Sequence, residues 1–209
     1  MTTEMAVAEK LLQVKAIQLN VQTPYTWASG WKSPIYCDNR KTLSYPHVRE
    51  FIKSELSNAV FQNFADADAI AGVVTAGVPW GAMVADQIKL PFVYVRSAPK
   101  AHGLGNQIEG ELAPGSKVVV MEDLISTGKS SMEAIDALRA AGAEVVGLAA
   151  IFTYGFQKSV DLFAAQNIPL QILSNYDALC ELSKQKAMFS EQELEALAQW
   201  RIAPAEWGV

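Results

Sequence analysis

The chain has 209 residues, of which 50% are hydrophobic and 9% aromatic, so it can build one sizeable core and is not an intrinsically disordered protein. At roughly 150 residues per domain, this length predicts a single domain over residues 1–209. Lysine and arginine number 17 against 22 aspartates and glutamates, giving a formal net charge of -5. This balance argues against a protein that coats nucleic acid, which needs clustered basic residues.

The cysteines and the N-terminus favour a cytoplasmic protein. Cys37 and Cys180 lie far apart and match neither a metal-binding nor a disulfide pattern. The first twenty residues are interrupted by charges, unlike the apolar block of a signal peptide. Residues 69–85 carry no charge, but glycine and proline interrupt them and they fall short of the ~20 residues of a membrane helix.

The N-terminal segment predicts a helix, a flap and a second helix. Apolar residues recur at helical spacing from Val7 to Leu19, which predicts an amphipathic helix. Residues 24–40 are rich in aromatic residues and turn formers without a 3.6-residue period, which predicts short strands and turns. Helical spacing returns over residues 46–64. We expect residues 1–45 to supply an N-terminal helix and a hood over the main body.

Strands and helices alternate in the remaining chain. Continuous apolar runs, which are typical of strands buried on both faces, cover residues 69–74, 92–95, 117–121, 145–152 and 170–173. Helical patterns lie between most of them, at residues 81–89, 130–141 and 157–166, and a capping box at Ser190 and Glu193 precedes a last helix. This order predicts an α/β fold with a mostly parallel twisted sheet and flanking helices. Ligands of such sheets bind beyond the carboxyl ends of the strands.

The segment from Val118 to Ser131 carries the most informative pattern. An apolar strand is expected to end at two adjacent carboxylates, Glu122 and Asp123, and a hydroxyl-rich turn with one glycine then opens a helix. Free backbone N-H groups and the positive end of the helix therefore point to one place, which predicts a phosphate site. The carboxylates would accept hydrogen bonds from sugar hydroxyls and stabilise positive charge on the ring. The expected ligand is a phosphorylated sugar.

Two other interpretations of this segment stay open. Residues 128–130 match the end of a nucleotide P-loop, but Asp123 occupies the position of its first glycine and would face the triphosphate. Alternatively, Ser130 and Glu133 only cap a helix, and the acidic pair is a solvated strand end.

A second loop gathers basic residues after the strand at residues 92–95. Arg96, Lys100 and His102 lie close together and are followed by two glycines. A long segment with little periodicity is typical of a functional or mobile loop. Three such donors closing over a diphosphate would neutralise a leaving group and exclude water, so we expect a lid. The alternative is a solvated surface loop without a role.

These segments resemble the phosphoribosyltransferases, which bind 5-phosphoribosyl 1-pyrophosphate (PRPP). The pattern V-V-V-x-E-D-x-x-S-T-G at residues 118–128 carries that similarity. Y-x-R-x-x-x-K-x-H-G at 94–103, followed by G-N-x-I-E-G, resembles the orotate branch, as does S-G-x-K-S-P-x-Y at 29–36. The resemblance implies the phosphoribosyltransferase-like fold, Mg²⁺ bound through PRPP rather than by protein alone, and a homodimer whose lid is shared across subunits. It implies no nucleic-acid or membrane partner.

The resemblance also assigns roles to particular residues. Lys100, His102 and Asp123 would be catalytic. PRPP would be bound by the lid residues and the phosphate loop, namely Arg96, Lys100, His102, Glu122, Asp123, Leu124, Ile125, Ser126, Thr127, Gly128, Lys129 and Ser130.

Two further segments receive roles in the same way. Thr75, Ala76 and Gly77 resemble a pyrophosphate loop, although alone they match an ordinary strand-to-helix turn. Ser126 and the backbone near Tyr36 and Cys37 would contact orotate, whereas Trp27 and Trp31 of the same flap also fit a hairpin packed into a core. Some family members carry basic residues at two positions that are Ala28 and Ser97 here, so those contacts do not transfer.

The implied reaction transfers the 5-phosphoribosyl group from PRPP to orotate, giving orotidine 5'-monophosphate and pyrophosphate in the synthesis of pyrimidine nucleotides. A purine phosphoribosyltransferase remains an alternative, but it should lack the basic-loop pattern. A regulator that binds PRPP without chemistry is another, and it would need a basic helix or a DNA-reading domain.

Overall fold

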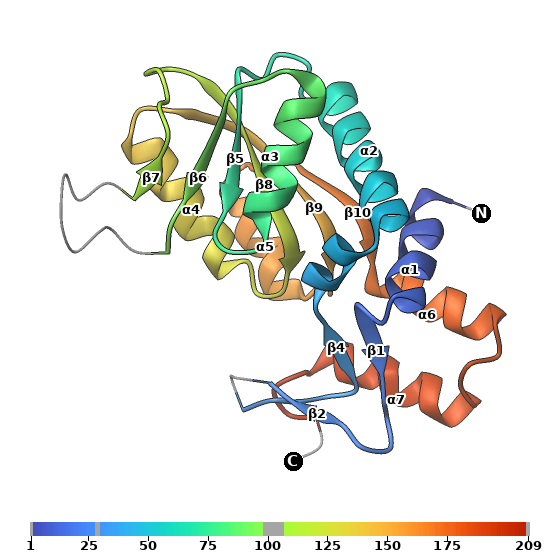
Figure 1. Cartoon of the computed structure of the whole chain (residues 1–209). Coiled ribbons are helices and arrows are strands. Elements are labelled where there is room, and N and C mark those ends of the chain that lie inside the picture. Colours follow the sequence, from blue (N-terminus) through green and yellow to red (C-terminus); the bar gives the residue numbers. More distant parts are fainter. Residues whose placement is uncertain (1, 28–29, 98–106, 208–209) are drawn as a thin grey trace.

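A computed structural model describes residues 2–27, 30–97 and 107–207 of the chain (Figure 1). Its main body is a sheet with the strand order β10-β9-β8-β5-β6-β7. The strands are β5 (Ala69–Val73), β6 (Phe92–Val95), β7 (Ile108–Glu109), β8 (Lys117–Ile125), β9 (Glu144–Thr153) and β10 (Leu170–Asn175). Within this described sheet β7 pairs antiparallel with β6, and the other neighbours pair in parallel. The predicted α/β fold with a mostly parallel sheet is confirmed.

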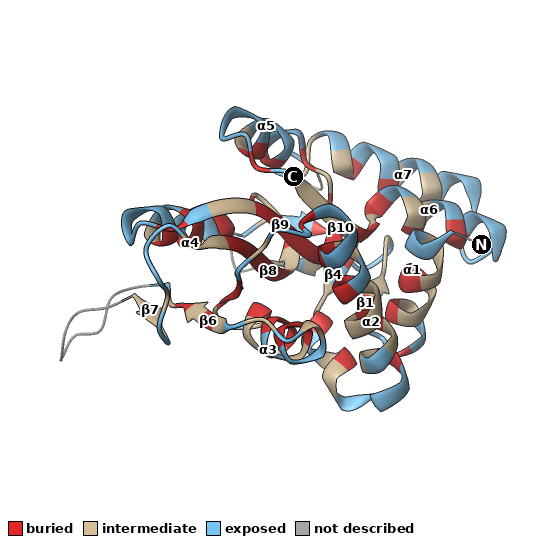
Figure 2. Ribbon diagram, turned by 90° about the horizontal axis from the view of Figure 1, so that it is seen from above, coloured by how far each residue is buried: buried red, intermediate tan, exposed pale blue. Residues whose placement is uncertain are grey.

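Helices cover both faces of the sheet, and Figure 2 shows α3 and α5 on opposite sides of it. One face carries α1 (Thr3–Gln13), α2 (Pro46–Asn63) and α3 (Gly77–Ile88); the other carries α4 (Lys129–Ala140) and α5 (Gln157–Ala165). Along β8, Val119 and Met121 belong to the first core, whereas Val118 and Val120 belong to the second. Successive side chains of a strand point to opposite faces, so a strand covered on both sides is apolar throughout.

The first helix is shorter than the sequence predicts. It ends at Gln13, and Lys15 then takes a left-handed backbone conformation with φ 55°. The next apolar residues form strand β1 (Ile17–Leu19), so Leu19 is not helical. It pairs with Ile35 of another short strand, and this pairing satisfies backbone groups that a longer helix would have satisfied internally.

Three elements beyond the hood also differ from the prediction. Strand β8 does not end before the acidic pair but continues to Ile125, because β9 runs beside it as far as Thr153. Helix α3 begins at Gly77, four residues before the predicted start at residue 81. A helix that the sequence analysis missed, α6 (Tyr176–Gln185), follows β10 directly, with Asn175 accepting a hydrogen bond from the Ala178 backbone as its N-cap.

The hood is built from both ends of the chain, as Figure 1 shows. From the N-terminal side come β1, β2 (Tyr25–Thr26), β3 (Lys32–Ser33), β4 (Ile35–Cys37) and the 3-10 helix η1 (Asn39–Ser44). Of these, β2, β3 and β4 match the short strands predicted for residues 24–40, whereas β1 lies in the segment predicted as helix. From the C-terminal side comes α7 (Glu191–Ile202), which starts at the predicted capping box. Trp200 of α7 donates a hydrogen bond from Nε1 to the Lys32 carbonyl at 3.2 Å.

Within the described part of the chain, none of the helices combines the length and the apolar character that crossing a membrane requires.

Candidate active site

Three hollows meet where β5 and β8 end beneath the hood. They have volumes of about 360, 340 and 280 Å³. Leu124 lines all three, and each pair shares a further residue: Ser130 for the first and second, Cys37 for the second and third, and Ser126 for the first and third. The three hollows therefore adjoin one another around Leu124, between the N-terminus of α4 and the aromatic part of the hood, and together they are called the groove.

The first hollow is the predicted phosphate loop. Its lining includes Ser126, Thr127, Ser130 and backbone at the start of α4. Gly128 is the N-cap of α4 with φ 79°, and a Cβ there would lie 2.9 Å from the Phe163 ring, so glycine is required. Among the described residues no side chain caps α4, which leaves first-turn N-H groups for a ligand.

Helix capping therefore does not explain this segment. The N-cap is Gly128 rather than Ser130, and Glu133 instead lies 3.8 Å from Lys129 in an ion pair on the exposed side of the helix. Among the described residues, the hydroxyls of Ser126 and Thr127 have no hydrogen-bond partner. Those two hydroxyls are available to an anion bound in the loop.

The acidic pair lies in the second hollow. Glu122 is only 5% exposed, and its carboxylate accepts hydrogen bonds from Ser131 Oγ at 3.2 Å and from the Asp123 backbone N-H at 3.0 Å. Burial, followed by the charge of Asp123, raises the pKa of Glu122 well above its usual value. Burial also raises the pKa of Asp123, which is half-buried. The pair is thus not a solvated strand end, and its negative charge is poorly compensated until a ligand arrives.

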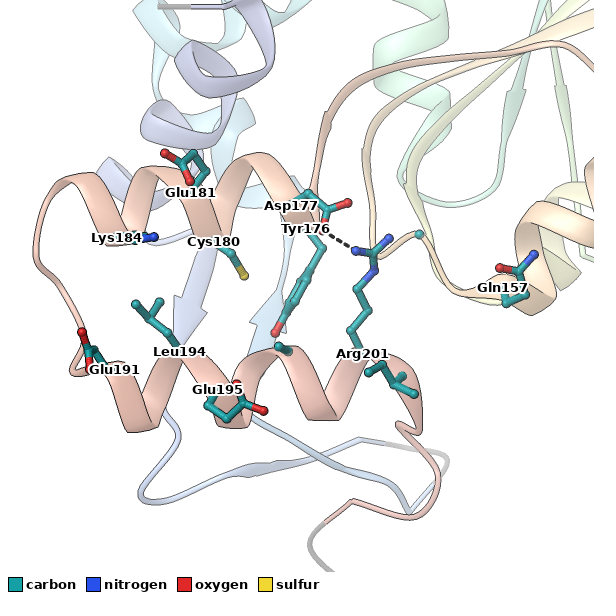
Figure 3. A pocket seen from close by; sticks show the side chains of 13 residues that line it. Gln157, Tyr176, Asp177, Cys180, Glu181, Lys184, Glu191, Leu194, Glu195 and Arg201 are labelled. Carbon is teal, nitrogen blue, oxygen red and sulfur yellow. Dashed lines mark hydrogen bonds and ion pairs between the residues drawn. The ribbon is translucent and has the colours of Figure 1, made fainter.

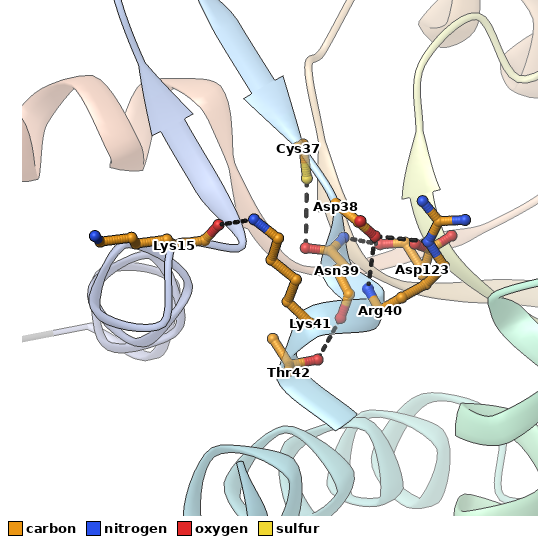
Figure 4. Close-up of polar contacts among 8 residues, drawn as sticks. All are labelled: Lys15, Cys37, Asp38, Asn39, Arg40, Lys41, Thr42 and Asp123. Carbon is orange, nitrogen blue, oxygen red and sulfur yellow. Dashed lines mark hydrogen bonds and ion pairs between the residues drawn. The ribbon is translucent and has the colours of Figure 1, made fainter. Parts of the chain in front are cut away.

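The hood supplies the opposite wall of this hollow through Cys37, expected near the base, and through Asp38 and Arg40, to which the sequence assigned no role. Figure 4 shows the polar contacts around them. Buried Asn39 donates a hydrogen bond from Nδ2 to the Asp123 carbonyl at 2.7 Å. Cys37 Sγ lies 3.4 Å from Asn39 Oδ1. Arg40 Nε lies 2.6 Å from Asp38 Oδ1. Both Arg40 and Asp38 line the hollow with the acidic pair. The polar run Asp38-Asn39-Arg40 directly after the hood strand was the available sign in the sequence.

The predicted pyrophosphate loop borders the same hollow. Val74, Thr75 and Ala76 line it, and the peptide bond between Val74 and Thr75 is cis. Gly77, the third residue of the predicted loop, is also required for packing. A Cβ at Gly77 would lie 2.3 Å from the Met121 carbonyl oxygen, so glycine lets α3 pack directly on β8 beneath the acidic pair.

The third hollow is aromatic. Its lining is Thr26, Trp27, Tyr36, Cys37, Leu124, Ser126 and Tyr154. All three residues expected at the base, Ser126, Tyr36 and Cys37, are among them. Trp27 and Trp31 stack with ring centroids 6.4 Å apart and pack against the core, as the hairpin interpretation expects. Tyr154, at the end of β9, was not singled out from the sequence, because it closes a long apolar run without a polar signature.

Of the predicted lid, the structure describes the two ends. The Arg96 N-H donates to the Gln107 carbonyl at 2.9 Å, and Gln107 Nε2 donates to the Arg96 carbonyl at 2.8 Å, so the ends are joined. Arg96 Nη1 lies 3.4 Å from Glu109 Oε1. Lys100 and His102 lie outside the described residues, as does Ala28, whereas Ser97 is described.

Comparisons with known proteins agree with this geometry. A family model for the phosphoribosyl transferase domain matches residues 42–175, more than half of the chain. An orotate phosphoribosyltransferase of Phocaeicola vulgatus is 54% identical over 206 residues, covering 99% of this chain and 97% of the relative. One of Listeria innocua is 52% identical over 208 residues and covers 100% of both chains. This chain belongs to the orotate phosphoribosyltransferases.

Structural comparison supports the same assignment. The crystal structure of orotate phosphoribosyltransferase from Aeropyrum pernix superposes with a TM-score of 0.75 at 28% identity, covering 88% of this chain and 99% of that one. Membership of the orotate branch decides against the purine alternative, because the curated relatives at more than 50% identity carry the orotate name.

A larger hollow of about 800 Å³ lies away from this orotate phosphoribosyltransferase groove, between α6 and α7 (Figure 3). Arg201 is ion-paired with Asp177 there. Cys180 points between the two helices, and burial raises the pKa of its thiol to about 11, so the thiol is protonated at neutral pH. This hollow is larger than those of the groove, but it is not the candidate active site, because it lacks the phosphate loop and the paired buried carboxylates.

Proposed function

We propose that the protein transfers the 5-phosphoribosyl group from PRPP to orotate, releasing pyrophosphate and forming orotidine 5'-monophosphate. The observation that carries this proposal is the meeting of three different hollows at one residue. Leu124 lines the phosphate loop, the acidic hollow and the aromatic hollow, so one ligand can reach them with a phosphate, a ribose and a base.

The phosphate loop suits the 5-phosphate of the product, and the aromatic hollow suits its pyrimidine. The 5-phosphate would lie against the first turn of α4, where N-H groups and the hydroxyls of Ser126 and Thr127 can donate to it. Each charge-assisted hydrogen bond of this kind contributes roughly 1.5–3 kcal/mol. The pyrimidine would lie in the aromatic hollow, whose neutral, partly apolar lining suits a flat ring.

The acidic pair suits the charge that develops during the reaction. As the bond from ribose C1 to pyrophosphate lengthens, the ring becomes cationic, and Glu122 and Asp123 lie in the hollow between phosphate loop and base. Burial makes their negative charge costly in the free enzyme, so a developing positive charge nearby is stabilised more than it would be in water.

The leaving diphosphate needs cations on the other side of that bond. Thr75 and Ala76 offer backbone groups, and Arg40 offers a guanidinium in the same hollow. Arg96, Lys100 and His102 complete the set if the lid closes, and we include in the proposal a homodimer in which each lid serves the neighbouring subunit. We also include a cytoplasmic location, in keeping with two free cysteine thiols.

Mg²⁺ fits this donor set through the substrate. Among the described residues no cluster of His, Cys, Asp and Glu could hold a metal ion by itself. The hollow nevertheless presents hard oxygen ligands at Asp123 and Asp38, and Mg²⁺ commonly joins one or two carboxylates to substrate phosphates. When bound, the ion would neutralise charge on the departing pyrophosphate.

The test is pyrophosphate release from PRPP and Mg²⁺ with orotate, guanine or adenine as acceptor, together with loss of orotate absorbance. We expect release with orotate alone. Release with a purine but not with orotate would contradict the proposal, and PRPP binding without release with any acceptor would favour the regulator.

A further inference from the structure

Tyr154 lines the aromatic hollow and packs against four other aromatic rings. Its backbone N-H donates to the Ile125 carbonyl at 3.2 Å, which ties the end of β9 to the end of β8. Its ring lies 5.1 Å from Trp27, 5.3 Å from Phe156, 5.7 Å from Trp200 and 5.8 Å from Phe152, measured between ring centroids. The side chain is 2% exposed, so its ring has one available position.

The ring of Tyr154 packs against other side chains, whereas its hydroxyl can bond to a ligand. Among the described residues it has no hydrogen-bond partner, although the residue is buried and lines the hollow. A second buried tyrosine of the same aromatic cluster behaves differently, because the Tyr176 hydroxyl donates to the Leu197 carbonyl at 3.0 Å. The Tyr154 hydroxyl is not among the fully buried, unpartnered side-chain atoms of the described residues, so it is reachable from the hollow and a ligand there can become its partner.

The surroundings decide which kind of partner fits. Burial, followed by nearby Cys37 and Asp123, raises the pKa of Tyr154 well above its usual value. The oxygen therefore keeps its proton and acts as a donor. No lysine or arginine is among the residues described around this hollow, so an acceptor that enters it depends on hydroxyl donors. Of these, Thr26 and Tyr36 are exposed and Ser126 is half-buried, whereas Tyr154 is buried.

We propose that the Tyr154 hydroxyl donates a hydrogen bond to an oxygen of the pyrimidine substrate and so positions the base for attack on C1. The inference rests on the proposed function and adds a base-contacting residue to Ser126, Tyr36 and Cys37. Because the ring is fixed by four aromatic neighbours, the donor is already oriented when the base arrives, and little conformational entropy is lost on binding.

Tyr154→Phe tests this with the ring retained and the donor removed. We expect KM for orotate to rise about 5-fold or more, as loss of one hydrogen bond to a substrate oxygen implies. KM for PRPP should stay within about 2-fold, because the phosphate loop and acidic pair are untouched. The melting temperature should not fall, since the hydroxyl has no partner within the described protein.

Tyr176→Phe is the matched control. It removes a hydroxyl that is bonded inside the protein, so it should lower the melting temperature and leave KM for orotate unchanged. The proposal is overturned if Tyr154→Phe leaves KM for orotate unchanged, or if it raises KM for both substrates equally. An inactive wild-type enzyme would instead overturn the proposed function, so the two failures are distinguishable.

Discussion

Asn39→Ala probes the joint between the hood and the acidic strand. Asn39 is 0% exposed and donates from Nδ2 to the carbonyl of Asp123 at 2.7 Å. The pairing of β8 with β5 ends at Met121. Beyond that residue β5 offers no partner to the Asp123 carbonyl, which therefore depends on Asn39 of the hood for its hydrogen bond. Truncation removes the donor and leaves a partly buried acceptor unpaired.

The size of the effect follows from that acceptor. An unsatisfied buried carbonyl costs about 1–3 kcal/mol, so we expect the free energy of unfolding to fall by about 2 kcal/mol. For a chain of this length that corresponds to a fall in melting temperature of roughly 4–8 °C. Urea denaturation followed by tryptophan fluorescence measures it, because Trp27 and Trp31 lie in the hood.

Asn63→Ala is the matched control. Its side chain also donates to a backbone carbonyl, that of Ala59, but on an exposed helix end. We expect a change within about 0.5 kcal/mol, as is usual for surface substitutions. If Asn39→Ala destabilises the protein no more than Asn63→Ala does, the bond to Asp123 does not hold the hood, and the reasoning is refuted.

Three further predictions concern the groove. Gly77→Ala should lower the free energy of unfolding by roughly 1–3 kcal/mol in chemical denaturation, because its Cβ would meet the Met121 carbonyl; unchanged stability would contradict the close packing of α3 on β8. The folded-state pKa of Glu122 lies above 4.5, its ordinary value, so its contribution to stability falls as pH rises above 4.5. The unfolding free energy of wild type minus that of Glu122→Gln should therefore decrease as pH rises above 4.5, and a difference that increases would contradict the raised pKa. Lys100→Ala and His102→Ala should lower kcat on the order of a hundredfold with orotate at saturation; undiminished turnover in both variants would remove the lid role.

The sequence predicted the sheet well because buried strands have a local signature. The run at residues 92–95 matches β6 at both ends, and every other predicted run became a strand of the same sheet. The missed end of β8 depends on the length of β9, a partner more than twenty residues away that no local window contains. Helix α6 was missed although apolar Tyr176, Leu179 and Leu182 recur at helical spacing, because it follows a strand without a break.

Parts of the site that lie within one short segment could be predicted from the sequence. The phosphate loop lies within one turn, so its residue pattern alone predicted it. Arg40, Asn39 and Tyr154 reach the groove through the packing of hood and β9, so their positions require the tertiary structure. Burial of Glu122 likewise depends on Ser131 and the covering helices rather than on its neighbours in sequence.

Trp200 gives the two ends of the groove different assembly times on the ribosome. The residues of the phosphate loop and of its supporting strands are all translated before residue 176. Trp27 and Tyr154 pack edge-on against Trp200, which is added later. The wall of the aromatic hollow is therefore incomplete until Trp200 has been synthesised, whereas every residue of the anion-binding end is already present by then.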